Sequence, residues 1–199
     1  NDEIVVQFDE PLFVKDLDSK VLSLIKPVYD ALASVTPNIK IVVTTYFEHS
    51  NEATKVLVNT PIWAIGLDFI HGNKNLEILE FIKNSNKVLI AGVIDGRNIW
   101  KSNFQSKIQL LNKVSKIINK ENIIVSTSCS LLHVPFTLKY EDNLDKEIKS
   151  WLAFANEKLQ ELSLVSKQFF DFKLNLDEIS VIRKNAEENN QRKISSKIH

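Results

Sequence analysis

The sequence predicts an α/β fold, a partial (β/α)8 TIM barrel of about five βα units. Two observations indicate this fold. Short, nearly continuous apolar runs alternate with stretches of helical period, at intervals of about 25 to 35 residues. A polar cluster then follows each apolar run. The alternation is typical of βαβ units, which form a parallel sheet with right-handed crossovers.

Five runs rich in β-branched and apolar residues are predicted as strands. Most are hydrophobic throughout, which is the pattern of strands covered on both faces. They are Ile4–Phe8, Ile39–Phe47, Trp63–Ile70, Val88–Ile94 and Ile123–Thr127. Three stretches between them have apolar residues at helical spacing. These are Val21 to Leu32, Leu76 to Ile82, and Ile108 to Ile118.

The last third of the chain predicts one long amphipathic helix and then a tail. The helix extends from Glu141 to about Phe170, with Asp142 or Asn143 as its N-cap. Beyond it, the segment 183–199 carries charges of both signs and almost no apolar residues. We therefore predict a barrel portion over residues 1–182 and a polar linker or disordered tail over residues 183–199.

Composition and charge exclude several classes of protein. Hydrophobic residues make up 44% of the chain, which excludes global disorder, and no apolar run approaches the roughly 20 residues of a membrane helix. The 25 basic and 25 acidic residues cancel, so bulk charge favours neither a nucleic-acid nor a membrane partner. The one cysteine excludes an internal disulfide and indicates a reducing, cytoplasmic location. The chain starts without methionine or a signal segment, so we expect a piece of a longer polypeptide.

Each predicted strand ends in polar residues that a core does not require. The clusters are Asp9-Glu10-Pro11, Thr44–Glu48, Asp68 with His71-Gly72-Asn73, Asp95-Gly96-Arg97-Asn98, and Ser128-Cys129-Ser130. The C-terminal ends of parallel strands carry the active face of a barrel, and an open sheet binds ligands there too. A cluster after all five strands favours the barrel. Five βα units are too few to close an eight-stranded barrel, so three βα units are missing.

Two of these clusters allow a catalytic or binding role beside a structural one. Asp9 and Glu10 could form an acid–base pair, or they could cap a helix and bind strand-end amides. Arg97, with Asn98 beside it, could clamp a carboxylate or phosphate, or it could pair with Asp95 to hold the loop.

The cysteine and histidines also allow two interpretations. Cys129 could be a residual metal or redox residue, or a small buried hydrophobe. His71 and His133 could be ligands, but neither cluster contains a second metal-type partner, which favours structural roles.

Taken as a set, the strand-end clusters resemble the N-terminal barrel of cobalamin-independent methionine synthase. They occur in the order and spacing of that family, and the resemblance covers essentially the whole chain. The set comprises Val6–Pro11, Thr44–Glu48, Gly66–Asp68 with His71-Gly72, Ala91–Trp100, Ser128–His133 and Lys149–Ala155. The family has two duplicated (β/α)8 barrels, and this chain is similar to about the fourth to eighth strands of the first. The tail is similar to the start of the connection to the second barrel.

The resemblance implies that the metal chemistry takes place outside this chain. The family holds homocysteine and zinc in its C-terminal barrel, through a His, two Cys and a Glu. If the two barrels are superimposed, Cys129 falls near a thiolate position and Asp68 near the carboxylate position. The remaining ligand strand is replaced here by Thr44–Phe47, which offers no soft ligand. We therefore expect no metal or cofactor in this chain, and zinc in the parent enzyme.

The implied function is that of a methyltransferase fragment. The parent transfers a methyl group from 5-methyltetrahydropteroyl-polyglutamate to homocysteine, and this part supplies scaffold and one wall of the folate cleft. Its partners would be the rest of the polypeptide, folate and homocysteine, and the isolated chain would be inactive. The alternative is a standalone partial barrel that binds a small anion through Arg97, Asn98 and Asp9, or that pairs with another chain. Unpaired edges near Ile4 and Thr127 would then favour self-association.

Overall fold

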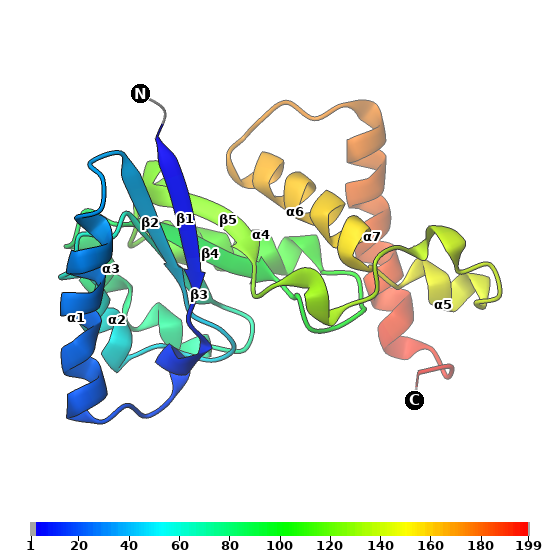
Figure 1. Ribbon diagram of the computed structural model, residues 1–199. Helices are drawn as coiled ribbons and strands as arrows, with labels where there is room; N and C mark the ends of the chain where they lie inside the picture. Colours follow the sequence, from blue (N-terminus) through cyan, green and yellow to red (C-terminus); the bar gives the residue numbers. More distant parts are fainter. Residues whose placement is uncertain (1–2, 199) are drawn as a thin grey trace. The chain divides into compact units, whose positions relative to one another are not determined.

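The computed structural model describes residues 3–198 as an α/β protein (Figure 1). The chain forms two compact units. Unit 1 contains the described residues up to Val93 together with Lys113–Cys129, and unit 2 contains Ile94–Asn112 together with the described residues from Ser130 onward. No helix among the described residues is long and apolar enough to cross a membrane.

All five predicted strands are present, and they form one sheet in the order β1-β2-β3-β4-β5. Their bounds are β1 Ile4–Asp9, β2 Ile39–Thr44, β3 Ala64–Asp68, β4 Val88–Ile94 and β5 Ile123–Thr127. The first four pair in parallel, with Ile4 opposite Ile39 and Asp9 opposite Thr44. Sequential order with parallel pairing is the arrangement of a barrel wall, so the predicted fold class is confirmed.

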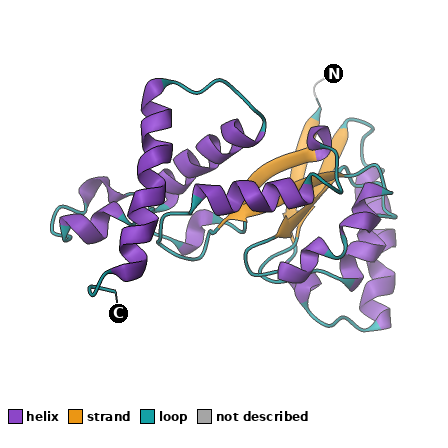
Figure 2. Ribbon diagram, turned by 180° about the vertical axis from the view of Figure 1, so that it is seen from behind, coloured by secondary structure: helices purple, strands orange, loops and turns teal. Residues whose placement is uncertain are grey.

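The helices of unit 1 lie on one side of the sheet, as helices outside a barrel wall do (Figures 1 and 2). The α-helices are α1 Ser19–Ala33, α2 Glu52–Leu57 and α3 Leu79–Lys83, and the 3-10 turns are η1 Pro11–Val14, η2 Asn73–Leu76 and η3 Lys120–Asn122. Asp18 begins α1 by accepting the Val21 N–H at 2.8 Å. Helix α1 then buries Ile25 and Tyr29. Helix α2 has no counterpart in the sequence prediction.

Burial is greatest in the middle of the sheet. All five residues of β3 are buried, as expected for a strand covered on both faces. The expectation fails for β1, where Ile4 and Val5 are 53% and 56% exposed. Strand β1 has only β2 as a neighbour in the described sheet, so its other edge is not hydrogen-bonded to a strand of that sheet.

Unit 2 is mainly helical. It contains η4 Leu131–His133, η5 Leu138–Tyr140, α5 Lys146–Ser150, α6 Ala155–Phe169 and α7 Leu176–Ile194, together with the start of α4 Phe104–Val114. The prediction of one helix from Glu141 to Phe170 is wrong, because α5 and α6 are separate. Between them the backbone pairs with a distant loop, as Ala153 N–H donates to the Ile99 carbonyl at 2.8 Å. Backbone hydrogen bonds between these two segments replace the ones that a continuous helix would make within itself.

The break changes how the two helices begin and which face is buried. Asp145, rather than Asp142 or Asn143, caps α5 through the N–H groups of the following turn. The burial of α6 does not follow its apolar residues. Leu159 is 52% exposed, whereas Lys158 is fully buried.

The predicted polar tail is helical as far as Ile194, because residues 183–194 belong to α7. Asn175 and Glu178 begin this helix by exchanging hydrogen bonds between each side chain and the other's backbone N–H. Its buried residues are polar: Asn185, Glu188 and Asn189. The helix passes position 183 without interruption. That residues 183–199 lead toward a second barrel stays a prediction.

Candidate functional site

The ends of β1 and β2 bring one predicted site residue, Asp9, into a cluster of donors. The Asp9 carboxylate accepts hydrogen bonds from the Thr44 hydroxyl at 2.6 Å, the Gln7 amide at 2.7 Å and the Tyr46 hydroxyl at 3.4 Å. A Cβ at Gly66 would come within 2.6 Å of the Thr44 methyl, so this glycine makes room for the threonine. The arrangement fixes one oxygen of Asp9 at the strand ends.

Glu10 lies in different surroundings from its neighbour Asp9. Its carboxylate accepts a hydrogen bond from the hydroxyl of Tyr29 on α1 at 3.3 Å. Burial, and then the Glu10 charge, raise the pKa of Tyr29 above its usual range. The structure thus directs Glu10 toward α1 and Asp9 toward Thr44, and the two carboxylates bind different hydroxyl groups.

Asp68 organises the turn that follows β3. It is fully buried, and its Oδ1 accepts the N–H groups of Ile70 and His71 at 2.8 and 3.0 Å. The Asn75 amide donates to the Asp68 carbonyl at 2.8 Å. A Cβ at Gly72 would come within 2.6 Å of that carbonyl, so glycine allows the turn to close.

Cys129, two residues beyond the end of β5, is not part of a disulfide and is 1% exposed. Burial raises the pKa of Tyr46, and the charges of Asp9 and Cys129 add to that effect, while a hydrogen bond with Thr44 opposes it. The raised pKa extends the pH range over which the Tyr46 hydroxyl keeps its proton and donates to Asp9.

The cluster after β4 lies in unit 2 and forms its own turn. Asp95 accepts the Arg97 backbone N–H at 2.8 Å and the Asn98 side-chain amide at 2.5 Å. The Asn98 oxygen accepts the Trp100 N–H at 3.0 Å. Asp95 and Asn98 therefore both order the loop, with the Arg97 backbone N–H bound to Asp95.

The described residues, 3–198, contain no group of three His, Cys, Asp or Glu side chains placed to hold a metal ion. At the end of β2, Thr44 and Tyr46 present hydroxyl groups that hydrogen-bond to Asp9. Hydroxyls bound in this way do not fit zinc, which prefers thiolate and imidazole ligands.

Comparison with known proteins identifies the family. Residues 2–119 match the family model described as the cobalamin-independent synthase, N-terminal domain. The chain belongs to this family. A 5-methyltetrahydropteroyltriglutamate–homocysteine methyltransferase of Desulforamulus reducens is 47% identical over 198 residues, which is 100% of this chain and 26% of that protein. Arabidopsis thaliana has a chloroplastic protein named 5-methyltetrahydropteroyltriglutamate–homocysteine methyltransferase 3. It is 39% identical, over 82% of this chain and 20% of that protein.

A solved structure supports the same fold. A B12-independent methionine synthase from Shewanella, in complex with selenomethionine, superimposes with a TM-score of 0.60. The superposition covers 84% of this chain and 50% of that chain, at 19% identity. The chain spans about a quarter of the length of the Desulforamulus relative.

Within this member of the synthase family, unit 2 contains a buried polar network that the sequence did not predict. Helix α6 provides Lys158 and Glu161 to the loop between β4 and α4. Lys158 donates to the Trp100 carbonyl at 3.1 Å and to the Asn98 oxygen at 3.5 Å. Glu161 accepts the Ser102 N–H at 3.0 Å. Because Asn98 also binds Asp95, α6 helps to hold the strand-end turn in place.

Helix α7 holds the same loop from its own buried face. The Asn185 side chain accepts the Phe104 N–H at 3.1 Å and donates to the Ser102 carbonyl at 2.9 Å. Asn189 donates to that carbonyl as well, at 3.3 Å. Glu188 pairs with Lys101 at 2.7 Å. An amide can satisfy a backbone N–H and a carbonyl at once, which explains why asparagine suits this face.

The sequence contains a weak signal of this network. Asn185, Glu188, Asn189 and Arg192 follow one another at helical spacing. Polar residues at that spacing usually indicate a solvated face, so the segment gave no reason to expect burial.

Proposed function

We propose that this chain is one part of a 5-methyltetrahydropteroyltriglutamate–homocysteine methyltransferase, an enzyme of methionine biosynthesis. The observation that carries the proposal is 47% identity over 100% of the chain to the Desulforamulus enzyme of that description. The matched N-terminal domain of the cobalamin-independent synthase and the barrel-wall topology support it. The parent polypeptide acts in the cytoplasm, and it transfers the methyl group of the folate to homocysteine.

Within that enzyme the chain serves as scaffold and as one wall of the folate cleft. Methyl transfer to a thiol requires a strong sulfur nucleophile, which zinc supplies by keeping the sulfur as thiolate near neutral pH. The polar strand ends of this chain are occupied with ordering turns: Asp68 binds two N–H groups, and Asp95 binds Arg97 and Asn98. The zinc ligands and homocysteine therefore belong to the remainder of the polypeptide, which is the main partner of this chain.

The test compares the native polypeptide with the isolated chain. An antibody raised against these 199 residues recovers the native protein from source cells, and methionine formation from 5-methyltetrahydropteroyltriglutamate and homocysteine is measured. We expect a polypeptide several times the size of this chain that is active. The recombinant chain, assayed in parallel with added zinc, is expected to form no methionine.

Two results would contradict parts of the proposal. A native band of the chain's own size without methyl transfer would reject the parent enzyme and favour the standalone anion-binding alternative. Methyl transfer by the isolated chain would reject the scaffold role.

A further inference from the structure

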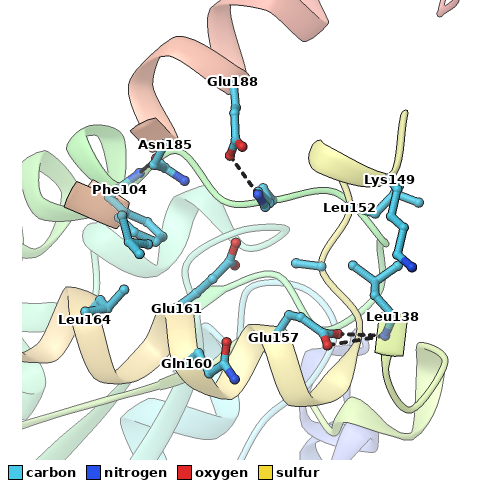
Figure 3. A pocket seen from close by; sticks show the side chains of 13 residues that line it. Phe104, Leu138, Lys149, Leu152, Glu157, Gln160, Glu161, Leu164, Asn185 and Glu188 are labelled. Atoms are coloured by element: carbon cyan, nitrogen blue, oxygen red, sulfur yellow. Dashed lines mark hydrogen bonds and ion pairs between the residues drawn. The ribbon is translucent and has the colours of Figure 1, made fainter. Parts of the chain in front are cut away.

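Unit 2 contains a cavity of about 380 Å³ between α6 and α7 (Figure 3). Much of its wall is apolar and comes from several elements of the unit. The apolar lining includes Phe104, Leu138, Leu152, Leu164 and Val181. A space of this volume lies within the range of small-molecule sites, which are mostly apolar with a few polar groups that orient the ligand.

Glu161 provides a polar group in this wall that lacks a full set of partners. The residue is 6% exposed, and its Oε1 accepts the Ser102 N–H at 3.0 Å. No donor among the described residues reaches Oε2, which is buried. Figure 3 shows the carboxylate directed away from α6, into the space that the lining residues enclose. A buried acceptor without a donor is costly, and a ligand that supplies the donor removes that cost.

The charges around the cavity decide what kind of donor fits. Lys158 and Lys101 already favour the ionised form of Glu161, although burial has the larger effect and raises its pKa to about 7. Glu188 is paired with Lys101, and the Glu157 carboxylate accepts hydrogen bonds from three groups. A further cation would have to be desolvated beside two lysines, so an uncharged donor is favoured.

The apolar walls of the cavity restrict the class of ligand further. An amide ligand would bring a carbonyl group as well as its N–H, and Phe104 and Leu164 offer no donor to that carbonyl, which would have to reach a polar lining residue such as Gln160. A hydroxyl group can supply the single donor while the remainder of the molecule contacts the apolar side chains.

We propose that this cavity binds a small uncharged molecule with an apolar body and one hydroxyl group, which donates a hydrogen bond to Oε2 of Glu161. The site is separate from the proposed methyltransferase role and does not depend on it. The same volume filled by a molecule without a donor would leave Oε2 unsatisfied. The preference for a hydroxyl is therefore the property that distinguishes this site from a merely apolar cavity.

The test uses three probes of nearly equal shape on the complete chain, at a pH above the pKa of Glu161, where its carboxylate is an acceptor. Benzyl alcohol carries the hydroxyl, ethylbenzene replaces it with a methyl group, and benzylammonium replaces it with a cation. Binding is followed by NMR shifts of the methyl groups of Leu138, Leu152, Leu164 and Val181, which line the cavity. We expect benzyl alcohol to bind about fivefold or more tightly than either of the others.

Three variants assign the preference to Glu161. Glu161→Leu should bind benzyl alcohol and ethylbenzene equally, whereas Gln160→Leu, a change at the neighbouring lining residue, should keep the preference. Val181→Trp places a large side chain in the cavity and should abolish binding of all three probes. Circular dichroism shows whether each variant is folded. If Glu161→Leu does not fold, two measurements still test the proposal: the probe comparison on the unmodified chain, and the loss of binding in Val181→Trp.

The proposal is overturned by any of three results. The first is no shift of the cavity methyl groups with benzyl alcohol. The second is binding of ethylbenzene by the unmodified chain as tight as that of the alcohol, and the third is a folded Glu161→Leu variant that keeps the preference for the hydroxyl.

Discussion

The Glu161 carboxyl is held by its surroundings near the midpoint of its titration at neutral pH. Burial raises its pKa from 4.5 to about 7, against the opposing effects of Lys158, the Ser102 hydrogen bond and Lys101. Between those two pH values the folded chain binds a proton at this group that the unfolded chain has released. The folded state is therefore most stabilised by this group below pH 4.5, and the stabilisation is lost as the pH rises toward 7.

Replacing Glu161 with glutamine should remove this dependence on pH. In the unmodified chain this group lowers the free energy of unfolding by roughly 3 kcal/mol between pH 4.5 and pH 7. Glu161→Gln does not titrate and keeps an oxygen for the Ser102 N–H, so its stability should be nearly flat over that range. Urea unfolding at several pH values from 5 to 8 measures the difference.

A matched change at an exposed carboxyl provides the control. Glu187→Gln, on the solvent side of α7, should keep the slope of the unmodified chain. Asp145 and Glu178 have lowered pKa values because Lys197 and Lys167 bind them, so their stabilisation is lost at more acidic pH, below this window. An equal slope in Glu161→Gln and the unmodified chain would contradict the prediction.

At the scale of elements, α7 is an example of a helix anchored by polar side chains. Most helices gain stability by burying an apolar stripe. Here Asn185 and Asn189 bind backbone groups of the loop that precedes α4. The loop gains partners for its buried polar groups, and the helix gains an attachment that apolar side chains could not provide.

Asn185→Ala should weaken that attachment strongly. It leaves the Phe104 N–H without its Asn185 acceptor, so we expect a loss of about 2 to 3 kcal/mol in the free energy of unfolding. Asn190→Ala makes the same chemical change at an exposed position of α7 and should alter stability by no more than about 0.5 kcal/mol. Urea unfolding monitored by circular dichroism compares the two variants. Equal effects would show that the buried hydrogen bonds are not what anchors the helix.

At the scale of the whole molecule, the sheet has an edge at β1 that bears exposed apolar side chains. Ile4 and Val5 are each more than half exposed, and β1 pairs only with β2 among the described strands. A net charge of zero adds no electrostatic repulsion between copies. Exposed strand edges of this kind recruit other strands.

The isolated chain should therefore self-associate, and a charge on β1 should reduce this. Val5→Lys places a lysine on the exposed edge strand, which should shift the sedimentation profile toward monomer by a severalfold weaker association. Val35→Lys adds the same charge at a 75% exposed position outside the sheet and should leave association unchanged. A monomeric profile of the unmodified chain at high concentration would reject the prediction.

The amino-acid sequence by itself determined the five strands, their polar ends and the family. A strand such as Val88–Ile94 is specified by a local run of apolar residues, and its bounds agree with the prediction. The strand-end clusters are local too, which is why Asp9, Asp68 and Asp95 could be selected as candidates before their contacts were known.

Only the tertiary structure decided the break between α5 and α6, the burial of α7 and the surroundings of Glu161. Each depends on a partner far away in the chain: Asn185 binds Ser102 across 83 positions, and Glu161 binds it across 59. Local periodicity indicates whether a segment can bury an apolar face, but it does not show whether a polar side chain will hydrogen-bond to a distant backbone group. The polar interior of unit 2 consists of such long-range hydrogen bonds, so only the folded structure reveals it.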